Sequence, residues 1–293
     1  MIYEQPKFLS AGDRYILIEF GDEMNLLLNF TAQGLASAVA AAGITGIIET
    51  APCFASLLVH YEPALIKRED VERELMALIA SMGSFEAIEL RSRIFYLPAL
   101  YLDPWTKECV EHYCRTITPK TPDPELLVEL NGLEDLNHLV RLHSSSEYWV
   151  AALGFWPGLP FLMPLDPRAR LTAPKYNPPR TNTPQGAIGL GGAAHSIYPV
   201  ATPGGYQIFA RTPVPIWDQS GTHPDFEKAM CLFRPGDRIR FVPVTREEYD
   251  ETEARVNEGR YRYTMVGYQK FSVEAYSEWT SAISVTCTTE GIQ

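Results

Sequence analysis

The sequence lacks the motifs of several common enzyme classes. The chain of 293 residues has five cysteines, an odd number, and contains no C-x-x-C pair. We therefore expect neither a zinc site nor a redox dithiol, and no bound metal. No G-x-x-x-x-G-K-[ST] loop is present, and Gly189–Gly192 is only a fragment of G-x-G-x-x-G. G-x-S-x-G and H-E-x-x-H are absent too. The chain thus carries no signal for binding ATP or a dinucleotide on its own.

Positive charge and long apolar runs are also scarce. Lys and Arg number 25 against 36 Asp and Glu, which gives a formal net charge of -11 and argues against a nucleic-acid partner. No apolar run reaches the ~18 residues that cross a membrane, and the first residues lack the basic and apolar regions of a signal peptide. Together with the unpaired cysteines, these absences lead us to expect a cytoplasmic protein with no membrane partner.

What is present is typical of a globular protein of about two domains, with 46% hydrophobic and 21% charged residues. Apolar periodicity predicts strand, helix, strand, strand and helix over 13–20, 26–42, 44–50, 56–61 and 67–82. Gly43 is a candidate helix C-cap, and a strand pair is expected to begin within 85–95. This order indicates a ferredoxin-like α+β domain over residues 1–93.

The second part of the chain has a different pattern. Helices are expected at 103–115, 122–130 and 133–141. Short strand-like runs then follow between Gly/Pro turns, at 147–153, 187–190, 196–200, 206–214 and 238–244. Such spacing is typical of an all-β barrel or sandwich, and we assign it to a domain over 94–245. The extension 246–293 is expected to hold a charged helix, a strand and a short helix, with no regular structure over 284–293.

The segment Pro174–Asp218 is the candidate functional region. It gathers Gly, Pro, Asn, Thr and aromatic residues around a few side chains that can act on a ligand. Those side chains include Arg180, His195, Tyr206 and Arg211. Because binding residues are disproportionately found on loops held by a rigid scaffold, we expect the working surface here.

Three segments in and before this region resemble one family. They are GFWPGLPFLMP (154–164), PPRTNTPQG (178–186) and IGLGGAAHSIYPVATPGGYQIFART (188–212). The family they resemble is that of allophanate hydrolase subunit 1, which includes the B subunit of 5-oxoprolinase, a sporulation kinase inhibitor and half of the carboxyltransferase domain of urea carboxylase. The resemblance extends over about residues 10–280. It implies a ferredoxin-like N-terminal domain followed by a cyclophilin-like β-barrel.

Two branches of this family compete. LDPRARL (165–171), KYNPPRTNTP (175–184) and PGGYQ (203–207) resemble urea carboxylase, whereas GFWPGLPFL is closer to the free-standing oxoprolinase-type subunits. We favour a subunit of a biotin-dependent, urea-carboxylase-like carboxyltransferase acting on urea or a urea-like amide. The alternatives are the B subunit of an ATP-dependent 5-oxoprolinase or lactam hydrolase, and a non-catalytic regulatory binder of a kinase.

The favoured resemblance implies partners and roles. Biotin would be carried by another chain, ATP would be used only by a partner, and the partners would be an allophanate hydrolase subunit 2-like protein and a biotin carboxylase or carrier. Carboxyl transfer needs oxyanion stabilisation and proton removal, so His195 and Arg180 are the catalytic candidates. The substrate-binding candidates are Tyr176, Asn177, Gly204, Gly205, Tyr206, Gln207 and Arg211. Each also has a structural interpretation: a strand-end histidine, a loop brace, a tight turn or packing at a strand edge.

Overall fold

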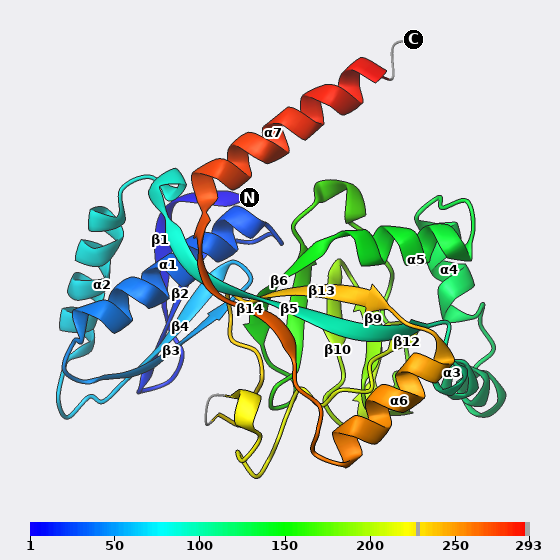
Figure 1. Ribbon diagram of the computed structural model, residues 1–293. Coiled ribbons are helices and arrows are strands. Elements are labelled where there is room, and N and C mark those ends of the chain that lie inside the picture. Colours follow the sequence, from blue (N-terminus) through cyan, green and yellow to red (C-terminus); the bar gives the residue numbers. More distant parts are fainter. Residues whose placement is uncertain (227–228, 291–293) are drawn as a thin grey trace. The chain divides into compact units, whose positions relative to one another are not determined.

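A computed structural model describes residues 1–226 and 229–290, and shows a mixed helix-and-strand protein with three sheets (Figure 1). Internal contacts divide the chain into two units: Met1–Ser92 together with the residues from Tyr268 onward, and Arg93–Gly267. None of the helices in the described residues is long and apolar enough to span a bilayer. The domain limits and the cytoplasmic setting expected from the sequence stay predictions.

The first unit contains a four-stranded antiparallel sheet with strand order β1-β2-β4-β3. Its elements are β1 (Ile2–Ser10), β2 (Tyr15–Gly21), α1 (Leu26–Ala42), β3 (Ile47–Cys53), β4 (Ser56–Tyr61), α2 (Arg68–Met82) and the 3-10 helix η1 (Phe85–Ala87). Buried and half-buried residues alternate along β2 and β4, and the buried ones pack with α1 and α2 into one core. Gly43 ends α1 with φ 58°, which confirms the predicted C-cap.

The strand expected to follow α2 does not join this sheet. Residues 85–87 form a 3-10 helix instead of starting a strand pair, and β5 (Glu89–Tyr101) pairs within the larger sheet. The edge position beside β2 is taken by β1. The sequence pattern did not reveal β1 because Pro6 and several polar residues interrupt it, and proline within a strand is confined mainly to sheet edges.

The chain ends in β14 (Thr264–Ser272) and α7 (Val273–Glu290). Phe271 and Tyr276 contact Phe30 of α1, with ring centroids 5.2 and 5.3 Å apart. The expectation of no regular structure from residue 284 is wrong up to Glu290, because the helix continues without a Pro or Gly to end it. Residues 291–293 lie outside the described part.

The second unit holds the larger sheet and the helices around it. Its helices are α3 (Pro104–Thr116), α4 (Asp123–Leu130), α5 (Leu136–Ser145), α6 (Arg246–Asn257) and the 3-10 helices η2 (Pro167–Ala169) and η3 (Pro224–Phe226). Its strands are β6 (Glu147–Leu153), β7 (Pro160–Pro164), β8 (Arg180–Thr183), β9 (Ala187–Gly191), β10 (Ala194–Ile197), β11 (Thr202–Gly204), β12 (Gln207–Arg211) and β13 (Arg238–Pro243). These elements follow the predicted order of helices, then short strands, then a charged helix.

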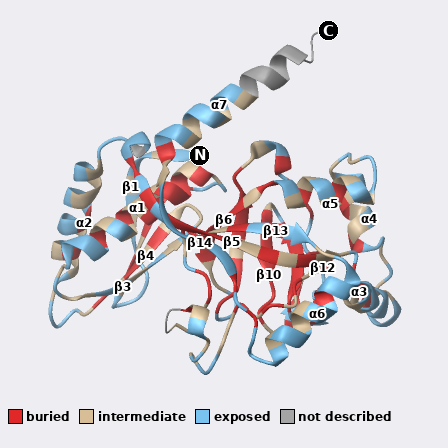
Figure 2. Ribbon diagram, viewed as in Figure 1, coloured by how far each residue is buried: buried red, intermediate tan, exposed pale blue. Residues whose placement is uncertain are grey.

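The strand pairings of this sheet close on themselves. The order is β12-β9-β10-β7-β6-β13-β5-β14, and β12 also pairs with β5. The β13–β5 pair is parallel, while the pairs between β5, β12, β9, β10, β7, β6 and β13 are otherwise antiparallel. Figure 2 shows that buried residues concentrate on these strands. The short strands β8 and β11 form a separate two-stranded sheet.

The core of the second unit is organised by strand alternation. Phe95, Leu97, Val150, Ile197 and Phe241 are among the buried side chains that form one cluster. Successive residues of a strand face opposite sides of the sheet. The residues that alternate with these core residues along each strand therefore project from the other face. Ser196 of β10 projects from that other face, and the cavity that it lines is the candidate site.

Candidate functional site

A small cavity of about 220 Å³ lies in the second unit. It is formed by the loop between β6 and β7, the segment around β8, the end of β10 and the segment that follows β11. The residues that line it are Phe155, Leu159, Phe161, Lys175, Pro179, Ser196, Tyr198, Pro203, Gly204, Gly205 and Tyr206. Three of the predicted substrate-binding residues, Gly204, Gly205 and Tyr206, therefore lie together at one cavity.

Glycines make room for the aromatic rings of this cavity. A Cβ on Gly191 would lie 2.3 Å from the Tyr206 ring, and one on Gly204 would lie 2.4 Å from the Tyr198 hydroxyl. At Gly205 an added Cβ would meet nothing closer than 3.5 Å. Burial raises the pKa of Tyr206 to about 12, so its hydroxyl stays protonated near neutral pH.

A buried carboxylate organises the residues behind the cavity. Asp123, at the start of α4, is fully buried and accepts hydrogen bonds from the Lys120 ammonium group and the Tyr176 hydroxyl. It also accepts one from the backbone N–H of Ile208 at 2.6 Å. The Arg180 guanidinium lies 3.7 Å from the same carboxylate. Two cations, one phenol and one strand amide thus converge on a single acidic group, as a buried charge requires.

Gln207 and Tyr176 are held by this network. The Gln207 side-chain oxygen accepts from Lys120 at 2.8 Å, and its amide nitrogen donates to the Pro174 carbonyl at 2.6 Å. Burial and the nearby Asp123 charge raise the pKa of Tyr176. Lys120 lies 4.2 Å from the centre of the Tyr176 ring, in cation–π contact. Both predicted residues therefore have protein partners for their polar groups.

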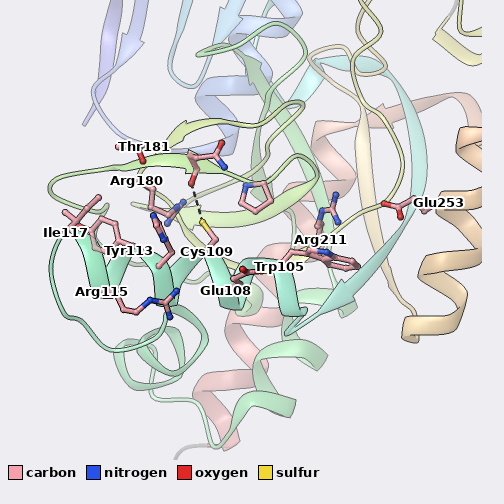
Figure 3. A pocket seen from close by; sticks show the side chains of 13 residues that line it. Trp105, Glu108, Cys109, Tyr113, Arg115, Ile117, Arg180, Thr181, Arg211 and Glu253 are labelled. Carbon is pink, nitrogen blue, oxygen red and sulfur yellow. Dashed lines mark hydrogen bonds between the residues drawn. The ribbon is translucent and has the colours of Figure 1, made fainter.

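A second, larger cavity of about 560 Å³ lies beside α3 (Figure 3). Arg180 and Arg211 both line it, together with Trp105, Cys109 and Arg115. Arg180 donates to the Tyr206 carbonyl at 2.7 Å, so it links the backbone of the small cavity to the lining of the large one.

Arg211 is engaged by aromatic rings. Its guanidinium lies 4.6 Å from the Trp105 ring and 5.6 Å from the Tyr249 ring, and its Nε donates to the Gln185 carbonyl at 2.7 Å. Arg246 of α6 also lies 4.6 Å from the Trp105 ring. These contacts give Arg211 a structural role in joining α3 and α6 to β12, whether or not it also binds a ligand.

His195 lies away from both cavities. Its side chain is fully buried, and its ring contacts Tyr148, His143 and Phe209 with centroids 4.9, 5.0 and 6.5 Å apart. Burial lowers its pKa to about 3. His195 is absent from the described lining of both cavities. Its catalytic role stays a prediction, and this placement does not support it.

The remaining predicted residue, Asn177, is exposed and lines neither of the two cavities described above. Sequence reasoning also missed Asp123 and Lys120. Asp123 follows Pro122 at a helix start, where acidic residues are common for helix-dipole reasons alone, so its sequence context carries no sign of a network. Among the described residues, no group of three or more His, Cys, Asp or Glu could hold a metal ion.

Comparison with known proteins agrees with the sequence resemblance. Residues 6–226 match the family described as "Carboxyltransferase domain, subdomain C and D". The chain is 32% identical over 292 residues to urea amidolyase of Saccharomyces cerevisiae, covering 97% of this chain but only 16% of that protein. It is 29% identical over 248 residues to the B subunit of 5-oxoprolinase from Bacillus subtilis, covering 81% of this chain and 92% of that protein.

Solved structures give the same result. The Kluyveromyces lactis urea carboxylase structure matches with a TM-score of 0.83 and 30% identity over 98% of this chain and 26% of that one. The protein TTHA0988 matches with a TM-score of 0.58 and 27% identity over 79% of this chain and 40% of that one. The family resemblance seen in the sequence is thereby confirmed.

We predict that Asp123→Asn strongly destabilises the protein. The substitution leaves the buried Arg180 and the largely buried Lys120 without their shared carboxylate, which should lower the free energy of unfolding by about 3–5 kcal/mol. Asp135→Asn is the matched control, because Asp135 is the N-cap of α5 and Asn caps equally well. Urea denaturation of both variants measures the difference; similar stability for the two would contradict the role of Asp123.

We predict that stability falls between pH 6.5 and pH 4. Burial lowers the pKa of His195 to about 3, and burial together with His195 lowers that of His143. At His195 the unfolded chain binds a proton in this window while the folded chain does not, so this imidazole removes ~1.4 kcal/mol per pH unit as pH falls. The lowered pKa of His143 adds a contribution of the same sign. Denaturation at several pH values measures the slope. It should flatten in His195→Leu; an unchanged slope would contradict the assignment.

Proposed function

Because this chain belongs to the carboxyltransferase domain family of subdomains C and D, we propose that it is a subunit of a biotin-dependent carboxyltransferase that acts on urea or a urea-like amide. The observation that carries the proposal is the extent of the likeness. The match to the urea carboxylase structure spans 98% of this chain. The match to the 5-oxoprolinase relative spans 81% of it.

The proposed function also implies a particular fold for each domain and a set of partner proteins. The closed cycle of seven strand pairings supports a cyclophilin-like β-barrel, and the four-stranded sheet with two helices supports a ferredoxin-like first domain. The chain spans only 16% of the Saccharomyces cerevisiae relative. We therefore assign the remaining steps to partners: an allophanate hydrolase subunit 2-like protein and a biotin carboxylase with its carrier, with ATP used only by the partners.

In this proposal the small cavity holds the cyclic ureido group of biotin. The rings of Tyr198 and Tyr206 provide flat apolar surface, and Gly204 and Gly205 present backbone without side chains beside them. These four residues would hold the group, which supplies the carboxyl to be transferred. The backbone N–H of Gly205 is the oxyanion donor in this proposal, since glycine permits close approach.

The chain's own residues would orient the reactants and exclude water. Arg180 fixes the Tyr206 backbone through its 2.7 Å hydrogen bond, and Arg180 and Arg211 line the neighbouring cavity, where an anionic carboxylated product would find positive charge. A proton acceptor for the substrate nitrogen is assigned to the partner subunit, because His195 is enclosed in the core.

A second candidate function is supported by the likeness to the 5-oxoprolinase relative. The chain covers 92% of the Bacillus subtilis 5-oxoprolinase relative, so it matches a free-standing subunit as well as a piece of a larger enzyme. In that case the same cavity would serve ATP-dependent opening of a lactam, without biotin.

We predict that the complex with both partners incorporates labelled bicarbonate into urea or a simple amide. Incorporation should require ATP and stop when avidin is added, because the transferred carboxyl is carried on biotin. The measurement is radiolabel in the carboxylated product after chromatography at alkaline pH, because an N-carboxylate loses CO2 in acid. ATP-dependent hydrolysis of 5-oxoproline that persists with avidin, and no label in urea, would overturn the first function and support the second.

We predict that Gly205→Ala impairs turnover by roughly 10²-fold without unfolding the protein. The new Cβ has ordinary contacts of 3.5 Å or more with the protein but narrows the cavity. Gly267→Ala is the control, since its Cβ meets no atom within 4 Å, and Gly204→Ala should instead lower the melting temperature through its clash with Tyr198. Full activity of Gly205→Ala would exclude close ligand approach at this position.

A further inference from the structure

Ser196 is a polar group without a partner at the wall of the small cavity. Its side chain is 2% exposed, and its hydroxyl has no hydrogen-bond partner among the described residues. It also lines the cavity. The other buried polar side chain closest in sequence, His195, lines no part of this cavity.

Strand alternation explains why Ser196 faces the cavity. Ile197 and the ring of His195 lie in the core of the second unit, so Ser196, between them on β10, projects from the opposite face. Its neighbours in register are Phe161 on β7 and Gly189 on β9. Neither side chain offers a hydrogen-bonding group, so the adjacent strands leave the hydroxyl unpaired.

An unpaired buried hydroxyl is unfavourable for the folded protein. Alanine at this position would keep the strand and the packing and would remove the penalty. A ligand that hydrogen-bonds to the hydroxyl offsets the penalty when it binds, and the unpaired group then favours ligands that match it over ligands that do not. The rest of the wall, Leu159, Phe161, Tyr198 and Tyr206, is aromatic or apolar and suits a flat group.

Lys175 adds a charge requirement to the same cavity. It is exposed and lines the cavity, with its ammonium group 5.4 Å from the centre of the Tyr206 ring. None of the salt bridges among the described residues involves Lys175. A ligand with a negative group near Tyr206 would gain this cation as a partner.

We infer that Ser196 is a ligand-binding residue, and that the small cavity recognises a flat cyclic amide or ureido group through the Ser196 hydroxyl, with Lys175 contacting a negative group on the ligand. This inference rests on the proposed function for the choice of ligand class. It does not depend on which of the two candidate reactions the complex performs, because a lactam and a cyclic urea share this chemistry.

The test is direct binding to the 293-residue chain, without partner subunits. Three probes separate the contributions: 2-imidazolidinone has the ureido group alone, biotin has it with a carboxylate, and 5-oxoproline is a lactam with a carboxylate. Isothermal titration should show binding of at least one carboxylate probe in the millimolar range or tighter. Ser196→Ala should weaken binding roughly tenfold, the loss of one hydrogen bond. Lys175→Met should weaken the carboxylate probes and leave 2-imidazolidinone unchanged.

The matched control is Ser146→Ala. Ser146 is also buried, but its hydroxyl donates to the Glu147 carbonyl at 3.1 Å. Its loss should lower the melting temperature by a few degrees and leave binding unchanged. Ser196→Ala should keep or raise the melting temperature while weakening binding.

Three outcomes overturn the inference: no probe binds, Ser196→Ala binds as the parent does, or Ser196→Ala loses stability as the control does. The proposed function can fail separately, since a complex without bicarbonate incorporation leaves these binding measurements intact. Biotin binding without 5-oxoproline binding would support the inference with a cyclic urea as ligand, and the reverse would support it with a lactam.

Discussion

The Asp123 carboxylate is the constraint on which the candidate site depends. It is fully buried, and a buried charge is tolerated only when donors surround it. Lys120, Tyr176 and the Ile208 N–H donate hydrogen bonds to it, and the Arg180 guanidinium adds an ion-pair contact at 3.7 Å. Because the same Arg180 also binds the Tyr206 carbonyl, the carboxylate indirectly fixes the backbone beside the small cavity. The backbone of the site is therefore held in place by the ion pair and hydrogen bonds around Asp123, and not by the residues that would contact a ligand.

This arrangement explains which site residues could be predicted from the sequence. Gly204, Gly205 and Tyr206 lie at one cavity as the sequence suggested, because a Gly pair next to an aromatic residue is a visible signature of close backbone approach; their role in binding stays a prediction. Asp123 could not be found, since an acidic residue at a helix start has an ordinary explanation. His195 was chosen for its chemistry, yet strand alternation turns it into the core and presents Ser196 instead. A one-residue difference decides the face, and residue type alone does not reveal it.

The same contrast holds for the fold. The limits of α1 and β4 match the expectation residue for residue, because strong apolar periodicity and a Gly C-cap mark them. β1 was missed, since an edge strand with Pro6 needs no alternation. The pairing of β12 with β5 could not be predicted from the sequence either. Pairing between strands far apart in the chain depends on the assembled core and not on the local pattern.

Under the proposed function, the chemistry of the small cavity leaves proton removal to a second chain. Burial raises the pKa of Tyr198, and raises that of Tyr206 to about 12, so both phenols are protonated near neutral pH and serve as donors or walls. Lys175 contributes a cation, and Gly205 contributes backbone. The Tyr198, Tyr206 and Ser196 hydroxyls and the Lys175 ammonium group of the described lining can each donate a hydrogen bond to a negative group, whereas the imidazole of His195 is enclosed in the core. Under the proposed function, a site so one-sided needs its proton acceptor from a partner, which accounts for a family whose members work as subunits or as parts of longer chains.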